Sequence, residues 1–132
     1  MRGGLNMAVD ITQKVEIRAR VSKSELLAQV AEEAVELSLA AMDMAPAENS
    51  SDLAKAASKL AHSALKLRRT LSHKNPTPVT TEAAVLKVQE EVADVLLCLD
   101  LLGIDITDAN IDLIQEEKAT RWIHRLKGEC EC

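Results

Sequence analysis

The sequence predicts an all-α protein, a bundle of four to five helices that assembles as an oligomer. Apolar residues make up 47% of the 132 residues, and most are Leu, Ala, Val or Ile, with one Trp and neither Phe nor Tyr. Such a composition suits packed helices. Four Gly and three Pro are too few for the many tight turns of an all-β fold. Long Ala/Leu stripes need a partner, so we expect a homodimer, or a tetramer made of two dimers.

The first half of the chain contains three predicted helices. Residues 1–9 carry glycines and little periodicity and are expected to form a flexible leader. Loosely spaced apolar residues predict a short helix over residues 10–21. Ser22 and Glu25 form a capping-box pattern that opens a helix running to about residue 45. A polar loop at 46–51 follows, and Ser51 or Asp52 is expected to cap the next helix, over 53–72.

Two more helices are predicted after a connection at residues 73–80, which contains two prolines. Thr81 and Glu82 open what we expect to be the longest helix, which Gly103 terminates. Thr107 or Asp108 is expected to cap the last helix, which runs to about residue 126. Residues 10–127 are therefore predicted to form a single domain, followed by a flexible tail at 128–132 with a Cys-x-Cys sequence.

Charge and hydropathy limit the classes of partner. The net charge of −5 argues against the broad basic field that duplex nucleic-acid binding requires. No apolar run reaches the roughly 20 residues that a membrane span needs, and no signal peptide is visible. We therefore expect a cytoplasmic protein without a membrane partner. Basic residues that could meet phosphate locally cluster in the middle and near the end of the chain: Lys66, Arg68, Arg69, Lys74, Lys118, Arg121, Arg125 and Lys127.

Two acidic pairs are the candidate chemical site. Residues three apart lie on one helix face, so Glu33 and Glu36 project together, as do Glu91 and Asp94 on another helix. Glu33 lies on the predicted apolar stripe of its helix, and Glu91 lies on that of the later helix. We therefore expect the acids to point partly toward the core.

Such acids need a counter-ion. Two acidic pairs facing each other across a bundle would cost several kcal/mol per ion unless a cation neutralised them. A hard divalent ion bound by oxygens does so, which predicts Mg²⁺, with Mn²⁺ as a substitute, and a phosphorylated substrate that shares the metal. Solvated helix-face charges are the simpler interpretation of one pair. The repetition of the pattern in two helices favours the metal site.

The motifs resemble those of a known family. Residues 32–36 (EEAVE) and 90–94 (EEVAD) resemble the paired Glu-x-x-Glu and Glu-x-x-Asp motifs of the MazG-like, all-α nucleoside triphosphate pyrophosphohydrolases, and residues 118–122 (KATRW) with Arg125 resemble the basic-aromatic sequence of their last helix. The resemblance covers about residues 24–126. Residues 37–90, which include an extra helix, separate the motifs by more than the short family pattern.

The resemblance implies an activity and a set of site residues. The reaction would be hydrolysis of a nucleoside or deoxynucleoside triphosphate to the monophosphate and pyrophosphate, as in house-cleaning of the nucleotide pool. Glu33, Glu36, Glu91 and Asp94 would hold magnesium. Lys118, Arg121 and Arg125 would bind phosphate.

Three further roles follow from the residue types. A carboxylate that is not fully used as a ligand would orient or deprotonate the attacking water, and Glu36, beside Glu33, is our candidate for this base. Trp122 could stack on a nucleobase, although a single Trp on an amphipathic helix is more often core or interface. The Asn110 amide could contact a base or sugar, or simply cap the last helix.

Other functions remain open at this point. Phosphoribosyl-ATP pyrophosphohydrolase has a comparable EEAxE segment, but its histidine after the second motif is replaced here by Cys98 and Leu99. A histidine phosphotransfer bundle would use His62, with Lys66 four residues on. A di-iron bundle is excluded because no histidine follows an acid by three residues. A non-enzymatic helical interaction protein is the remaining alternative.

Overall fold

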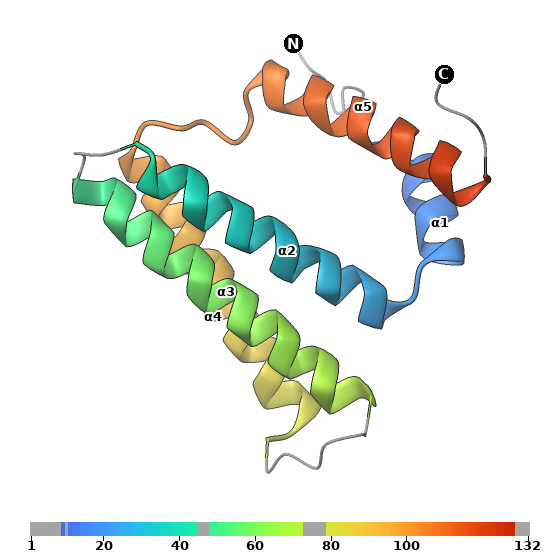
Figure 1. Ribbon diagram of the computed structural model, residues 1–132, viewed down its shortest axis with the longest axis horizontal. Helices are drawn as coiled ribbons and strands as arrows, with labels where there is room; N and C mark the ends of the chain where they lie inside the picture. The colour runs from blue at the N-terminus through green and yellow to red at the C-terminus, as the bar shows by residue number, and fades with distance from the viewer. Residues whose placement is uncertain (1–8, 10, 45–47, 73–78, 129–132) are drawn as a thin grey trace. The chain divides into compact units, whose positions relative to one another are not determined.

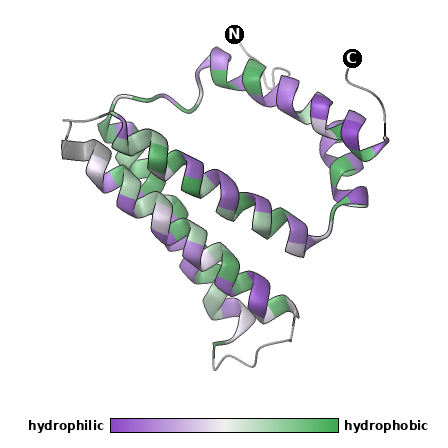
Figure 2. Cartoon of the chain, viewed as in Figure 1, coloured by the Kyte–Doolittle hydropathy of each residue, from purple (hydrophilic) through white to green (hydrophobic). Residues whose placement is uncertain are grey.

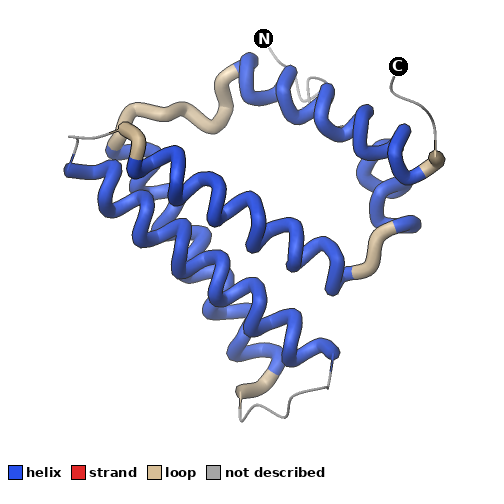
Figure 3. The backbone as a smooth tube through the Cα atoms, viewed as in Figure 1, coloured by secondary structure: helices blue, strands red, loops and turns tan. Residues whose placement is uncertain are grey.

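The computed structural model describes residues 9, 11–44, 48–72 and 79–128, and these residues form five helices and no strand (Figures 1 and 3). Most of the predicted leader and tail, and the Cys-x-Cys sequence, lie outside the described residues. The all-α prediction is confirmed. The helices are α1 (Ile11–Arg20), α2 (Lys23–Met42), α3 (Glu48–Ser72), α4 (Thr81–Leu101) and α5 (Ala109–Leu126).

The helices fall into two compact units. Lys23–Ile104 form a unit with α2, α3 and α4, and Met1–Ser22 with Asp105–Cys132 form a unit that contains α1 and α5. We call them the three-helix unit and the two-helix unit. The single domain expected over residues 10–127 stays a prediction.

Within the three-helix unit, α3 packs along both α2 and α4, whereas no Cα atom of α2 lies within 8 Å of one in α4. Alanines form a large part of these contacts. One cluster of buried residues joins α2 to α3, and a second cluster joins α2 and α3 to Val95 of α4. Because alanine is small, it lets helix backbones approach closely. The clusters consist of Ala31, Ala34, Ala61 and Ala64, and of Ala41, Leu53, Ala54, Ala56 and Val95.

The helix α3 differs from the prediction at its start. It begins at Glu48, so Ser51 and Asp52 are interior residues rather than caps, and with 25 residues it is longer than α4, which has 21. Ser51 and Asp52 are exposed while Leu53 and Ala54 are buried. The polar run therefore continues the solvent face of an amphipathic helix. The predicted stripe from Leu53 to Leu71 is confirmed as the face turned inward, since its members are buried or half-buried.

The ends of α4 and α5 follow the predicted signals. Thr80 caps α4 by accepting a hydrogen bond from the Ala83 N–H at 3.1 Å. Gly103 follows the helix with a φ of 78°, a left-handed conformation that favours glycine. Of the two candidates for the α5 cap, Asp108 is correct, and it accepts from the Asn110 N–H at 2.8 Å. Capping of α5 by the Asn110 side chain is therefore wrong.

The two-helix unit is held by polar and apolar contacts between α1 and α5. The Gln13 Nε2 group donates to Thr120 Oγ1 at 3.2 Å, and the Lys127 ammonium lies 3.2 Å from Glu16 Oε1. Ile17 of α1 and Ile123 of α5 are both buried. Figure 2 shows hydrophobic and hydrophilic residues side by side along both helices, as amphipathic packing requires.

None of the described helices is both long enough and apolar enough to cross a bilayer.

The alanine contact between α2 and α3 predicts the effect of a larger side chain. Ala34→Leu adds volume where α3 leaves no room, and we expect the free energy of unfolding to fall by about 1–3 kcal/mol. Ala40→Leu is the matched control, because Ala40 lies on the same helix and is exposed, and we expect a change within about 0.5 kcal/mol. Thermal unfolding followed by circular dichroism measures both. Equal destabilisation of the two variants would contradict the packing described.

Candidate functional site

Both acidic pairs belong to the three-helix unit. Glu33 and Glu36 lie on α2, and Glu91 and Asp94 lie on α4. Glu91 is buried, with 2% of its surface exposed, whereas the other three acids are exposed. Glu91 is therefore in a different environment from the other three acids.

The orientation of α2 corrects one expectation. Glu33 does not lie on the face of α2 that points to the core, because Glu33 and its neighbour Val30 are both exposed. The buried residues of α2 are instead Ala31, Ala34 and Ala41. Close packing against α3 uses the smallest side chains, and this turns the stripe of larger aliphatic residues to the edge of the contact. For Glu91 the expectation is confirmed, since it is buried together with Val95 one turn later.

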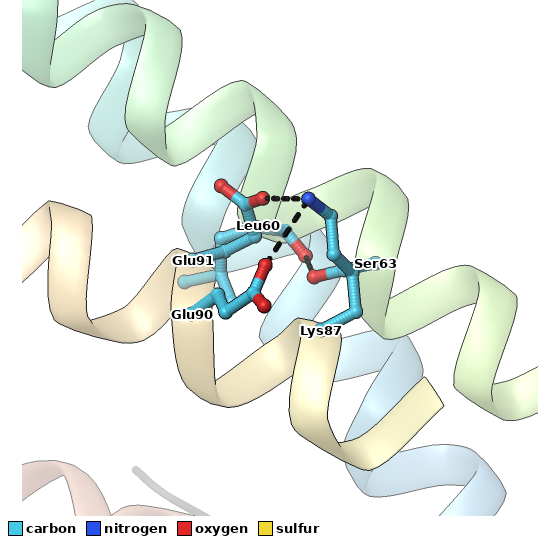
Figure 4. Close-up of polar contacts among 5 residues, drawn as sticks. All are labelled: Leu60, Ser63, Lys87, Glu90 and Glu91. Atoms are coloured by element: carbon cyan, nitrogen blue, oxygen red, sulfur yellow. Dashed lines mark hydrogen bonds and ion pairs between the residues drawn. The ribbon is translucent and has the colours of Figure 1, made fainter. Parts of the chain in front are cut away.

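The Glu91 carboxylate has two different oxygen environments. Its Oε1 atom lies 3.0 Å from the ammonium nitrogen of Lys87, one turn earlier on α4 (Figure 4). Its Oε2 atom is buried, and no described residue forms a hydrogen bond with it. A buried carboxylate oxygen without a partner is costly. Glu91 is therefore the acid of the site with the strongest need for a further cation or donor.

The Ser63 hydroxyl does not meet this need. Ser63 of α3 is buried and is drawn with the Lys87–Glu91 pair in Figure 4. Its hydroxyl donates to the Leu60 carbonyl oxygen at 2.9 Å. A hydroxyl has one proton to donate, so Ser63 has none left for Glu91 in this arrangement.

Lys87 is the functional candidate that sequence reasoning missed. Its ammonium also lies 3.4 Å from Glu90 Oε2, so it contacts both glutamates of the second motif. The hydrogen bond to Glu91, followed by the charges of Glu91 and Glu90, raises the pKa of Lys87 above its usual range, so the ammonium stays charged. The signal was present in the sequence, because a lysine four residues from a glutamate lies on the same helix face.

The other acids make few contacts. Glu33 accepts a hydrogen bond from the Gln29 amide at 2.9 Å. Carboxylate oxygens are the ligands that Mg²⁺ prefers, and the unpartnered Glu91 oxygen suits such an ion. Across the described part of the chain, however, no three His, Cys, Asp or Glu side chains are grouped so that they could hold a metal. The carboxylate oxygens thus suit a divalent cation. Within one chain, however, the four acids do not come together as a single cluster.

Asp52 is a second residue that sequence reasoning placed differently. Burial raises the pKa of the half-buried Cys98 thiol, and the charges of Asp52 and Asp94 raise it further. Asp52 of α3 and Asp94 of α4 therefore both lie close enough to act on one thiol. The sequence suggested Asp52 only as a cap, because the early start of α3 was not foreseen.

The predicted phosphate- and base-binding residues all lie on α5, in the two-helix unit. Trp122 is half-buried, next to the buried Ile123. The others are exposed: Asn110, Lys118, Arg121 and Arg125. The candidate residues are thus divided between the two units, with the acids in one and the basic residues in the other.

The raised pKa of Cys98 predicts its reactivity. The thiolate is the reactive form, so alkylation of Cys98 should require a higher pH than alkylation of an unfolded-chain cysteine. Asp94→Asn and Asp52→Asn each remove a negative charge, and both should move the pH–rate curve toward lower pH. The rate of reaction with iodoacetamide, measured in a chain with Cys130→Ser and Cys132→Ser, tests this. Glu82→Asn is the control, and curves that coincide for all variants would show that these charges do not act on the thiol.

Comparison with known proteins adds no assignment. No protein-family model, no curated protein and no solved structure matches this chain. The resemblance to the MazG-like enzymes therefore depends on the motifs at residues 32–36, 90–94 and 118–125 alone.

Proposed function

We propose that this protein is a magnesium-dependent pyrophosphohydrolase that converts a nucleoside or deoxynucleoside triphosphate to the monophosphate and pyrophosphate. The observation that carries the proposal is the Glu91 carboxylate, which is buried with its Oε2 atom unpartnered among the described residues. A protein that keeps a charged oxygen in this position needs a ligand of opposite charge to offset the cost. The motif around Glu91 resembles that of enzymes in which such a ligand is magnesium.

Each candidate residue has a role in this proposal. Glu91 and Asp94 would hold the metal together with Glu33 and Glu36, and the bound ion would neutralise charge on the phosphates of the substrate. Lys118, Arg121 and Arg125 would bind phosphate oxygens, to which their cationic groups are suited. Trp122 and Asn110 would contact the base or the sugar.

The reaction balances with water as the only co-reactant. The water oxygen forms a bond to a phosphorus atom beside the α–β bridging oxygen, and the bridging P–O bond breaks. Glu36 would accept a proton from this water, and its exposure leaves the carboxylate accessible to solvent. The products are the nucleoside monophosphate and pyrophosphate.

We also propose that the protein self-associates. Outside its contact with α3, the helix α4 exposes six large aliphatic side chains. Exposed apolar patches mark interaction sites. A second copy that covers α4 would also bring a second set of acids into the assembly. The exposed residues are Val85, Leu86, Val92, Leu96, Leu97 and Leu101.

A phosphotransfer role is the second candidate, and one observation favours it. His62 is exposed on α3, and so is Lys66 one turn later. A phosphorylated response regulator incubated with the chain would transfer phosphate to His62 in that case. Absence of transfer, together with pyrophosphate release from a nucleotide, would leave the hydrolase as the function.

The proposed activity predicts a loss on removal of one carboxylate. The wild-type protein should release pyrophosphate from at least one member of a panel of nucleoside triphosphates, deoxynucleoside triphosphates and phosphoribosyl-ATP, and only with Mg²⁺ or Mn²⁺. Glu91→Gln should lower kcat/KM by at least about a hundredfold, the upper end of the loss when a group that supports a metal site is removed.

Glu82→Gln is the matched control for that assay, because Glu82 is an exposed glutamate on the same helix outside the motif. We expect its activity to equal that of the wild type. The proposed function would be rejected if no substrate in the panel released pyrophosphate, or if Glu91→Gln were as active as Glu82→Gln.

Self-association predicts a difference between two equally exposed leucines. Leu97 of α4 is 58% exposed and Leu113 of α5 is 59% exposed. Leu97→Glu should convert the oligomer to monomers, because it places a charge in the proposed contact. Leu113→Glu should leave the oligomer intact. Light scattering at micromolar protein concentration measures both, and a monomeric wild-type protein would rule out the association.

A further inference from the structure

The Lys87 side chain connects solvent with the buried acid of the site. Its side chain is 56% exposed, whereas that of Glu91 is only 3% exposed. The ammonium nitrogen nevertheless lies 3.0 Å from Glu91 Oε1 and 3.4 Å from Glu90 Oε2 (Figure 4). The partly exposed Lys87 thus forms an ion pair with one oxygen of the buried Glu91 carboxylate.

This ion pair is positioned where a metal bound to Glu91 would interfere with it. A divalent ion bound to a carboxylate lies roughly 2–2.5 Å from its oxygen. An ammonium ion on the same carboxylate would then be at close range to a doubly positive charge, and repulsion between like charges is strong near a protein interior. A metal on Oε2 would therefore weaken the contact between the Lys87 ammonium and Oε1 of the same carboxylate.

We propose that Lys87 is a tethered cation that competes with the divalent metal for Glu91. The inference rests on the proposed function, in which Glu91 is a metal ligand. When the metal binds, the ammonium leaves Glu91, stays charged, and remains beside the exposed carboxylate of Glu90. The exchange breaks no covalent bond, and it replaces one positive charge at the buried carboxylate with two.

Competition of this kind has two consequences. Lys87 supplies Glu91 with a counter-ion while no metal is bound, so that the carboxylate can be buried during folding. It also lowers the affinity for the metal, because the ion pair must be broken each time the metal binds. The charge of Lys87, rather than its shape, is responsible for both effects.

The first test uses the wild-type chain. Lysines are acetylated with a limiting amount of an N-hydroxysuccinimide ester, and the modification of each residue is followed by mass spectrometry with and without Mn²⁺. Displacement from Glu91 leaves Lys87 only the longer contact with Glu90, so its acetylation rate should rise when Mn²⁺ is added. Lys59, an exposed lysine on α3, is the internal control and should not change. An unchanged Lys87 rate at saturating Mn²⁺ would overturn the proposal.

The second test compares variants by calorimetric titration with Mn²⁺, at a pH well above the usual carboxyl range. Lys87→Met should bind Mn²⁺ about fivefold more tightly than the wild type, because the ion pair with Glu91 no longer competes. Lys87→Arg keeps the charge and should bind as the wild type does. Lys59→Met controls for the loss of one positive charge elsewhere on the three-helix unit.

Stability gives a readout that does not depend on affinity. Without Mn²⁺, Lys87→Met should melt at a lower temperature than Lys87→Arg, and added Mn²⁺ should raise its Tm by more. A variant that folds only with Mn²⁺ would show the same effect in a stronger form.

The outcomes separate this inference from the proposed function. Equal Mn²⁺ affinity and an equal Tm increase in the wild type, Lys87→Met and Lys87→Arg would overturn the competition while leaving Glu91 as a metal ligand. Absence of Mn²⁺ binding in every variant would instead reject the proposed function and this inference with it.

Discussion

The close packing of alanines between α2 and α3 is the constraint on which the three-helix unit depends. Ala31 and Ala34 of α2 meet Ala61 and Ala64 of α3 in one cluster. Such a contact works only if the smallest side chains face each other, so it fixes the rotation of α2 about its own axis. That rotation leaves Glu33 and Glu36 at the surface, and α3 then provides the face on which α4 packs.

The helix α4 differs from α2 because the face that it buries carries an acid. Its buried residues are Ala84, Glu91 and Val95, and Val95 packs in the cluster that contains Leu53 of α3. A helix face that carries an acid inward must provide the acid with positive charge or hydrogen-bond donors. Lys87 provides a positive charge from the same helix, so this ion pair does not depend on the packing of another helix. The ion pair within α4 thus stabilises one oxygen of the buried Glu91, and the second oxygen remains available for a ligand.

Much of the fold could be predicted because helix ends carry local signals. Gly103 and Asp108 act where a terminator and a cap were expected. The start of α3 was misjudged because a run of polar residues is as typical of a helix's solvent face as of a loop. The orientation of Glu33 could not be predicted from spacing, because periodicity identifies an apolar stripe but does not say whether alanines or larger residues form the tightest contact. The burial of Glu91 was predicted correctly, because Val88 and Val95, about one turn before and after it on the same helix face, are half-buried and buried.

The small size of the buried side chains has a consequence for how the protein exists in solution. Among the described residues, Leu53 is the only large side chain with less than 2% exposure. The aliphatic area of α4 that stays exposed, such as that of Leu97 at 58%, does not contribute to the stability of a lone chain. If a second copy covers that area, the free energy of association is also free energy of folding. The lifetime of each folded chain would then depend on how often it meets another, and dilution would act on it as a denaturant does.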